Sequence, residues 1–346
     1  MTRSTAGQNW RAIDIFAGCG GLTEGIKRAG FEIISAVEND WLAAKTYRTN
    51  HPEVKLLEED VRLVSGSDLF TRKARKVHLI AGCPPCQGFS RVRHRNRLRA
   101  TGDKRNCLIT DFQRIVGETK PAAVFLENVP GIENYYRFKE FLRALRRWGY
   151  KITCETLDLA EYAVPQRRKR IVVLAGLDFE IEMPAKARVD RTVRSAIGNL
   201  KPPSKHRNPL HRQVTDHSPT MLKRIKAVPK DGGSRESWKG HLALECHDNF
   251  RGFSDVYGRM AWDKLAPTIT GGCINASKGR FVHPEQDRAI TLLEATLLQS
   301  FPKSYNLSLD RGRYSAAEMI GNALPPEFAR RVGRQIARAF EENGVG

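Results

Sequence analysis

The chain has 346 residues, of which 40% are hydrophobic and 28% charged, and its formal net charge at pH 7 is +20. This composition is typical of a folded globular protein, and the absence of an apolar stretch long enough to span a bilayer leads us to expect a cytosolic protein without a membrane partner. The basic excess favours a polyanionic partner, of which nucleic acid is the commonest, although a merely basic enzyme would also fit.

The first half of the chain alternates short apolar runs with stretches of helical periodicity, such as residues 138–148. The apolar runs are residues 12–16, 33–37, 77–81, 122–126 and 171–174. Consecutive Val, Ile, Leu and Ala residues are typical of strands in a parallel sheet that is covered on both faces. The alternation therefore predicts an α/β fold with a doubly wound, mostly parallel sheet.

The second half has a different texture, rich in Pro, Gly, His and basic residues between positions 183 and 265. We interpret this part as a second, smaller and loop-rich domain. Helical periodicity returns at residues 291–299 and 326–340, and Pro325-Pro326 suits the start of the last helix. We expect that helix to pack back onto the first domain.

The first predicted strand leads into a glycine-rich turn at residues 18–21. Glycine permits a tight turn and lets a ligand approach the backbone. A dinucleotide fingerprint would require a third glycine where the chain has Thr23, so the turn suits a nucleoside without a demonstrated pyrophosphate site. Glu38 ends the next strand, where a carboxylate can reach ribose hydroxyls, and Asp60 is placed to reach an adenine amino group.

Cys83 and Cys86 flank two prolines directly after the third predicted strand. The prolines fix two φ angles, so Cys86 should emerge from a stiff turn in a defined direction. A zinc site would need a second close pair of ligands, for which Cys246-His247 is poorly spaced, while redox chemistry and a nucleophilic role both remain open. A nucleophilic Cys86 would need an acid or base nearby, and Glu127 at the end of the fourth predicted strand could supply it.

Distinctive residues thus follow the ends of four predicted strands, at the glycine turn, at Glu38, at the Pro-Pro turn and at Glu127-Asn128. In open α/β sheets, ligands bind beyond the carboxyl ends of the strands. We therefore expect all four clusters to face one crevice.

An arginine-rich stretch begins shortly after Cys86 and contains Arg91, Arg93, Arg95 and Arg97. Alternating arginines suit a phosphate backbone, although a solvated charge run has the same composition. The position beside a candidate active-site turn favours a functional role. A second basic cluster, residues 165–170, precedes the fifth predicted strand.

Taken together, these motifs resemble the DNA (cytosine-5)-methyltransferase family of the bacterial and phage restriction-modification type. The matching segments are Phe16-Ala-Gly-Cys-Gly-Gly, Pro84-Pro-Cys-Gln-Gly-Phe-Ser, Glu127-Asn-Val, Gln166-x-Arg168-x-Arg170 and Gly321-Asn-Ala-Leu-Pro-Pro. The resemblance implies a Rossmann-like, S-adenosyl-L-methionine-dependent methyltransferase domain at residues 1–182. It also implies a target-recognition domain at residues 183–304 and a C-terminal segment, 305–346, that returns to the catalytic domain.

The resemblance further implies a mechanism. The thiolate of Cys86 would attack carbon 6 of a flipped-out cytosine, which makes carbon 5 electron-rich enough to accept the methyl group of S-adenosyl-L-methionine. Glu127 would hydrogen-bond the ring N3 and the exocyclic amine, and Arg170, supported by Arg168, would contact the O2 side. Asn128 would orient the loop, and loss of the carbon-5 proton would expel Cys86.

The same likeness assigns the cofactor pocket and the DNA interface residue by residue, with no metal. The residues expected at the cofactor are Phe16, Ala17, Gly18, Gly20, Gly21, Leu22, Glu38, Asn39, Asp60, Val61, Pro85 and Asn322. The residues expected at the DNA are Gln87, Ser90, Arg91, Arg93, Arg95, Arg97, Arg235 and Arg259.

The chain departs from the family at three positions. Leu293 and Leu297 stand where arginines are frequent, and Met319 stands where glutamine is common. These changes touch the junction with the small domain and the rim of the cofactor pocket.

Two other functions compete with methylation of a short duplex DNA sequence. A tRNA cytosine methyltransferase would use the same catalytic set, but the long basic segment 183–265 favours DNA readout. A catalytically silent DNA-binding regulator would not need the complete set of Cys86, Glu127 and Arg170. We expect a monomer in a prokaryotic cytoplasm, associated with the nucleoid, whose cognate restriction endonuclease, if one exists, acts separately.

Overall fold

The computed structural model describes residues 10–71, 76–85, 107–189, 191–238, 242 and 255–346. The chain divides into two compact units, which are described separately. Unit 1 comprises Met1–Tyr162, Lys169–Lys186 and Leu324–Gly346, and unit 2 comprises Ala163–Arg168 and Ala187–Ala323. The division thus differs from the expected boundaries at 182/183 and 304/305. The chain returns to unit 1 only at Leu324, and a short segment before the last strand belongs to unit 2.

Unit 1 is built on a seven-stranded sheet with the strand order β3-β2-β1-β4-β5-β7-β6. Its strands are β1 (Arg11–Ile15), β2 (Glu32–Val37), β3 (Lys55–Leu57), β4 (Leu79–Gly82), β5 (Ala123–Asn128), β6 (Tyr150–Asp158) and β7 (Lys169–Leu177). The pairs among β3, β2, β1, β4 and β5 are parallel, and β7 runs antiparallel to both β5 and β6. The predicted mostly parallel sheet is confirmed, and the five predicted strands correspond to β1, β2, β4, β5 and β7.

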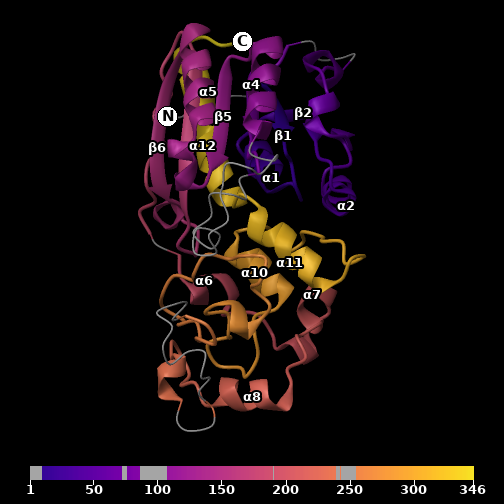
Figure 1. The fold of residues 1–346 in the computed structure, drawn as a ribbon, viewed down its shortest axis with the longest axis vertical. Helices are drawn as coiled ribbons and strands as arrows, with labels where there is room; N and C mark the ends of the chain where they lie inside the picture. Colours follow the sequence, from indigo (N-terminus) through magenta and orange to yellow (C-terminus); the bar gives the residue numbers. More distant parts are fainter. Residues whose placement is uncertain (1–9, 72–75, 86–106, 190, 239–241, 243–254) are drawn as a thin grey trace, which may run out of the picture. The chain divides into compact units, whose positions relative to one another are not determined.

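Helices cover both faces of this sheet, as Figure 1 shows, with α4 and α5 on one face and α1 and α12 on the other. The helices of unit 1 are α1 (Gly21–Arg28), α2 (Trp41–Asn50), α4 (Leu108–Thr119), α5 (Tyr136–Arg147) and α12 (Pro326–Glu342). Short 3₁₀ turns are η1 (Val61–Leu63), η2 (Gly66–Leu69), η5 (Pro130–Asn134) and η6 (Leu159–Tyr162). This layering is the doubly wound arrangement that the alternating pattern predicted.

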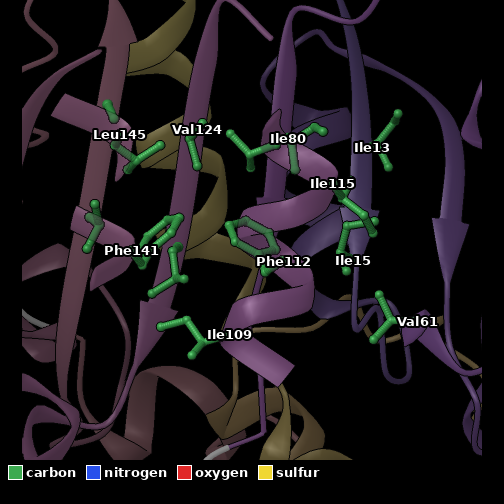
Figure 2. Packing of buried hydrophobic residues seen from close by; sticks show 14 of the residues in the cluster. Ile13, Ile15, Val61, Ile80, Ile109, Phe112, Ile115, Val124, Phe141 and Leu145 are labelled. Carbon is green, nitrogen blue, oxygen red and sulfur yellow. The ribbon is translucent and has the colours of Figure 1, made fainter. Parts of the chain in front are cut away.

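The core under α4 and α5 is packed from alternate strand positions (Figure 2). Ile13 and Ile15 of β1 both point into it, together with Phe112 of α4 and Phe141 of α5. The two phenyl rings meet edge to face with centroids 5.8 Å apart. Because successive strand residues face opposite sides, Asp14 must point to the other face of the sheet, toward α1.

The last helix packs against α1, as expected. A side chain at Gly25 of α1 would place a Cβ 2.4 Å from Cβ of Ala329 and 2.4 Å from the carbonyl oxygen of Pro326, so only glycine allows this approach. The indole of Trp10 donates to the carbonyl of Val345 at 2.9 Å, which fixes the end of the chain beside β1. The C-terminal helix therefore supports the helix that follows the glycine turn.

Two strands escaped the sequence reading. Strand β6 is an edge strand, and residues such as Lys151 and Glu155 along it are exposed. A search for consecutive apolar residues finds only strands that are buried on both faces. Strand β3, Lys55–Leu57, is too short to give a pattern.

Unit 2 contains short helices joined by long irregular segments. They are α6 (Val193–Ile197), α7 (Pro209–Arg212), α8 (Pro219–Lys226), α10 (Leu292–Leu298) and α11 (Arg313–Asn322), with turns η7 (Pro203–Lys205), η8 (Arg235–Ser237) and η10 (Ala276–Lys278). The predicted helix at 291–299 is α10, which starts with a capping box between Thr291 and Glu294. The loop-rich texture predicted for this region is therefore present in its described residues.

Candidate active site

The carboxyl edge of the sheet in unit 1 collects the residues that the sequence singled out. Strands β1, β2, β4 and β5 are parallel, so Glu38 and the Pro-Pro turn, which follow β2 and β4, lie at the same edge as Glu127 in the last two residues of β5. Strand β7 runs the opposite way, and Ile171 near its start pairs with Asn128 at the end of β5. The first residues of β7 are therefore delivered to this edge as well, which places Arg170 beside Glu127.

Glu127 and Arg170 form an ion pair at this edge, with Glu127 Oε1 2.7 Å from Arg170 Nε. Glu127 is 6% exposed, yet its Oε1 accepts no hydrogen bond from any residue that the structure describes. The guanidinium also donates, through Nη1, to the carbonyl of Lys169 at 2.7 Å. The site therefore offers a buried, charged acceptor with unused capacity next to a fixed cation.

Asn128 fastens the Pro-Pro turn to β5. Its side-chain nitrogen donates to the carbonyl of Pro84 at 3.0 Å, and its side-chain oxygen accepts from the backbone N–H of Val129 at 2.8 Å. At the start of the turn, a Cβ on Gly82 would lie 2.6 Å from the carbonyl oxygen of Ile15, so the turn leaves a close-packed strand. Pro84 is buried and Pro85 is half-buried.

Residues 86–106 lie outside the described part of the chain. They include the predicted nucleophile and most of the predicted DNA contacts: Cys86, Gln87, Ser90, Arg91, Arg93, Arg95 and Arg97. Within the described residues, no group of three or more His, Cys, Asp or Glu side chains is arranged to hold a metal ion.

The glycine turn after β1 has an unusual backbone. Phe16, Gly18 and Gly20 all have positive φ values, of 66°, 55° and 90°. Two glycines accept this without strain, whereas Phe16 carries a cost on the order of 1 kcal/mol, as residues at ligand sites often do. The turn exposes backbone groups to a ligand at the start of α1, where N–H groups lack helical partners.

Glu38 holds this turn from the end of β2. Its Oε2 accepts from the N–H of Gly18 at 2.7 Å, and its Oε1 accepts from the N–H of Asp40 at 2.8 Å. Burial raises the pKa of Glu38, and these two hydrogen bonds oppose the rise. Each carboxylate oxygen keeps a second lone pair, so the group can still accept from a ligand hydroxyl.

A buried hydrogen-bonded chain lies beneath the turn, and the sequence reading missed it. The hydroxyl of Thr23 donates to Asp14 Oδ2 at 2.7 Å and lies 2.8 Å from the hydroxyl of Tyr47. Asp14 is 1% exposed, and burial raises its pKa to about 7. The available signal was a carboxylate inside an otherwise apolar strand, which is rarely buried without a reason.

The other predicted cofactor residues differ in exposure. Ala17, Gly21, Leu22 and Val61 are buried, so they can contribute a wall or backbone groups, whereas Asn39 is exposed. The list of predicted cofactor residues also includes Asn322, which is exposed at the end of α11 in unit 2.

Asp60 caps the turn η1, and its carboxylate pairs with the guanidinium of Arg62, which lowers the pKa of Asp60.

The sequence analysis overlooked Trp41, whose side chain is 43% exposed at the start of α2. A large exposed aromatic residue three positions after Glu38 is a surface on which a nucleobase can stack.

Arg259, predicted to contact DNA, lies in the interior of unit 2 with 0% exposure. Its guanidinium donates to the carbonyls of Val228, His283, Gln286 and Ile225 at 2.8–3.1 Å and pairs with Asp287. Every donor direction is occupied, so the prediction of a DNA contact is corrected to a structural role. Arg235 is half-buried on η8 and remains a candidate.

Arg168, predicted to support Arg170 in catalysis, is 2% exposed in unit 2. It donates to the carbonyls of Ile269 at 3.2 Å, Gly321 at 3.0 Å and Ala323 at 3.2 Å. Its side chain thus joins backbone segments within unit 2, while Arg170 carries the charge beside Glu127.

Comparison with known proteins gives a consistent picture. A family model described as C-5 cytosine-specific DNA methylase matches residues 10–338. The type II methylase M.HgiDII of Herpetosiphon aurantiacus is 35% identical over 347 residues, covering 95% of both chains. The type II methyltransferase M1.HphI of Haemophilus parahaemolyticus is 32% identical over 335 residues, covering 94% of this chain and 86% of the relative.

A solved structure shares the fold. It is a putative DNA modification methyltransferase encoded within a prophage of E. coli, which superposes with a TM-score of 0.73 at 23% identity and covers 96% of this chain and 100% of that one. Among the described residues, no helix is both long and apolar enough to cross a membrane.

Proposed function

The chain belongs to the C-5 cytosine-specific DNA methylase family, and on that premise we propose that it methylates cytosine within one short sequence of duplex DNA. Members of this family are DNA (cytosine-5-)-methyltransferases, and the family implies S-adenosyl-L-methionine as methyl donor. The two relatives described above are named as type II enzymes, which supports a role in protecting DNA from a separately acting restriction endonuclease.

The observation that carries the proposal is the buried carboxylate of Glu127. Its Oε1 lies 2.7 Å from Arg170 Nε and accepts no hydrogen bond from the described part of the chain. A carboxylate oxygen that is paired with a cation but accepts no hydrogen bond keeps lone pairs for a donor on a ligand, and a hydrogen bond to a charged group is worth about 1.5–3 kcal/mol. The amine and protonated N3 of a cytosine under attack at carbon 6 are donors of this kind, and Arg170 would balance the ring oxygen on the other side.

Cys86 is the proposed nucleophile. The hydrogen bond from Asn128 to Pro84 anchors the turn two residues before Cys86 in the sequence. Burial raises the pKa of Cys19 and of Cys273 to about 12, so neither would be a thiolate near pH 7. In the proposed reaction a bond from sulfur to carbon 6 forms and makes carbon 5 nucleophilic. After methyl transfer, carbon 5 loses its proton and the sulfur–carbon bond breaks.

The residues around the glycine turn fit S-adenosyl-L-methionine, which would supply an electrophilic methyl group when bound. Glu38 would accept hydrogen bonds from the ribose, because its oxygens retain lone pairs beyond those used by Gly18 and Asp40. The exposed indole of Trp41 would stack on the adenine, and Asp60 would accept from the adenine amino group. The left-handed turn would bring backbone N–H groups to the amino-acid end of the cofactor.

Covalent trapping tests the nucleophile. DNA containing 5-fluorocytosine cannot lose a proton from carbon 5, so the enzyme should stay bonded to the DNA, and peptide mapping should place the bond at Cys86. Cys86→Ala should lower methyl transfer at least about 1000-fold while DNA binding survives. Cys154→Ala, which changes an exposed cysteine on β6, is the matched control and should transfer at the wild-type rate. An adduct on another residue, or normal transfer by the alanine variant, would refute the assignment.

The substrate requires a separate test. Duplex DNA and tRNA should be compared as acceptors of labelled methyl groups, and DNA from cells that express the chain should be sequenced after bisulfite treatment. We expect labelling of DNA only, confined to cytosines in one short sequence context. Preferential labelling of tRNA would support the RNA alternative, and binding without labelling of either would leave only a regulator.

A further inference from the structure

We infer that the buried carboxyl of Asp14 makes the glycine turn bind S-adenosyl-L-methionine more tightly than the product that remains after methyl transfer. The inference rests on the proposed cofactor site and concerns how that site separates the methyl donor from its product. The donor carries a sulfonium cation, whereas S-adenosyl-L-homocysteine contains an uncharged thioether. A negative charge close behind the turn would therefore favour the donor.

The position of Asp14 follows from the pleat of β1. Its neighbours Ile13 and Ile15 point into the core under α4 and α5, so Asp14 points toward α1 on the other face. There it meets Thr23 in the first turn of α1, whose hydroxyl donates to Asp14 Oδ2 at 2.7 Å. The backbone N–H of Thr23 also donates to the carboxyl group.

This carboxyl group takes the place of a helix cap. The N-cap residue of α1 is Gly20, which has no side chain to accept from the first N–H groups. A carboxylate at a helix N-terminus is favoured by the unpaired N–H groups and the helix dipole. The glycine turn and the start of α1 are thus held from behind by one acidic side chain on the neighbouring strand.

Tyr47 completes the chain of donors. The single proton of the Thr23 hydroxyl is used toward Asp14, so the Tyr47 hydroxyl, 2.8 Å from Thr23 Oγ1, is the donor in that contact. Both hydroxyls therefore point their protons toward Asp14. Its other oxygen, Oδ1, is buried and accepts no hydrogen bond from any described residue. The two hydroxyls therefore stabilise the ionised carboxylate only in part, and a nearby positive charge would stabilise it further.

Among the titratable groups around the glycine turn, Asp14 is the one whose protonation can change near neutral pH. Burial raises its pKa to about 7, and Glu38 across the turn adds to that rise. Burial also raises the pKa of Cys19 to about 12 and that of Tyr47 well above its usual range, and lowers the pKa of His51 to about 4, so these three groups are uncharged at neutral pH.

Several other charged groups lie on α1 and on α12, which packs against it. Lys27 on α1 forms an ion pair with Glu53, and on α12, Glu327 pairs with Arg330 and Arg331. Arg28 on α1 also pairs with Glu327 at 4.0 Å, and burial raises the pKa of Glu24 on α1, which the charges of Arg28 and Lys27 oppose. Glu38, and none of these groups, is the charged neighbour that acts on the pKa of Asp14. A cation that enters the turn would therefore act on the protonation of Asp14. If binding of the donor lowers the pKa of Asp14 by one unit, the donor binds about tenfold more tightly to protein with ionised Asp14 than to protein with protonated Asp14.

Calorimetry without DNA tests this inference. The dissociation constants of S-adenosyl-L-methionine and S-adenosyl-L-homocysteine should be measured at pH 6, 7 and 8. For the wild type, the preference for the donor should grow about three- to tenfold from pH 6 to pH 8. Binding of the donor near pH 7 should also release a fraction of a proton, detected by repeating the titration in buffers of different ionisation enthalpy.

Two variants sharpen the test. Asp14→Asn keeps the shape and removes the charge, so its preference for the donor should be the same at all three pH values and its proton release should vanish. Tyr47→Phe removes one donor to the chain and should move the change in preference to higher pH. If Asp14→Asn does not fold, the inference is still tested by the pH dependence of the donor preference in the wild type and in Tyr47→Phe, and by the proton release of the wild type.

The outcomes separate this inference from the proposed function. A wild-type preference that stays constant from pH 6 to pH 8 overturns the role of Asp14 while the cofactor assignment stands. An Asp14→Asn variant that retains the wild-type pH dependence overturns it as well. Failure of either ligand to bind at any pH overturns the proposed cofactor site itself.

Discussion

The two units hold their backbones together by different means. In unit 1, the seven strands pair in one continuous sheet, in which all but the edge strands β3 and β6 have neighbours on both sides, and apolar side chains fill both faces. In unit 2, long irregular segments leave many carbonyls outside any sheet, and arginines donate to several of them instead. Arg259 takes four carbonyls, Arg168 takes three, and Arg280 takes those of Gly232, Gly233 and Arg259.

This difference shows that a basic composition has two uses in one chain. Five donors in a fixed plane let one arginine replace several backbone hydrogen bonds, so part of the +20 net charge serves the interior of unit 2. Arg168 and Arg170 show both uses only two positions apart. The first is a structural arginine of unit 2, and the second is an ionic partner of Glu127 at the edge of the sheet.

Arg259→Met should have the largest effect. The substitution leaves four carbonyls without their donor and removes one of the two cations paired with Asp287, which should lower the free energy of unfolding by about 3–5 kcal/mol. Urea titration measures this loss, and Arg235→Met, on a half-buried arginine of the same unit, should change stability by less than about 1 kcal/mol. A stable Arg259→Met variant that loses only DNA affinity would restore the role predicted from sequence.

The paired variants Arg170→Lys and Arg168→Lys separate the two uses. Lysine at position 170 keeps the charge but not the planar fork, so methyl transfer should fall about 100-fold, equivalent to about 2.7 kcal/mol, with little change in stability. Lysine at position 168 has a single nitrogen in place of the two that reach these three carbonyls, so it should show the reverse, with a loss of about 2 kcal/mol in stability. Rates and urea midpoints measured side by side decide, and equal effects on both quantities in both variants would remove the distinction.

Acid should weaken unit 2 through His283. Burial lowers the pKa of His283 to about 4, whereas the unfolded residue titrates near 6.5. The folded form therefore binds the proton more weakly, so the stabilising contribution is complete above pH 6.5 and is lost as the pH falls toward 4. The loss should reach about 2 kcal/mol at pH 5.

His283→Gln removes this titration, and its urea midpoint should fall less than that of the wild type between pH 7 and pH 5. The matched variant in unit 1 is His51→Gln, because burial also lowers the pKa of His51 to about 4. Hydrogen exchange should assign each effect to its own unit. Unchanged acid sensitivity in His283→Gln would argue against the contribution of this residue.

Tyr150→Phe should have the smallest effect on stability. It removes a single side-chain hydrogen bond from unit 1, for comparison with Arg259→Met in unit 2. The hydroxyl of Tyr150 donates to the carbonyl of Pro121 at 2.6 Å, in a unit whose remaining backbone is held by the sheet. Loss of this one bond should cost about 1 kcal/mol in a urea titration. A cost near that of Arg259→Met would mean that single side-chain bonds matter as much in the sheet as in unit 2.

The same contrast explains how far the sequence predicts the fold. Strands buried on both faces consist of consecutive apolar residues, so β1, β2, β4 and β5 were predictable from the sequence. The edge strand β6 is mostly exposed or half-buried along its length and gave no such signal. The direction of β7 was not readable, because a run of apolar residues specifies burial and not the sense in which a strand joins the sheet.

The site was predictable where chemistry and motif coincide, as at Glu127, Arg170 and Glu38. It was not predictable where burial decides the role of a charge. Arg259 counts as a basic residue of the second domain in the sequence, but only packing shows that its donors are used internally. Asp14 was overlooked for a related reason, because its strand reads as apolar and its partners Thr23 and Tyr47 come from two separate helices.

The position of Arg168 bears on attempts to exchange recognition parts between relatives. A transplant of residues 187–323 alone would separate the carbonyls of Ile269, Gly321 and Ala323 from the Arg168 of their own chain, and the recipient's arginine would have to fit a foreign backbone. The donor's own residues 163–168 must therefore travel with it, while Arg170 stays in the recipient to meet Glu127. Hybrid enzymes should be joined between these two arginines, at a point that motif boundaries alone would never suggest.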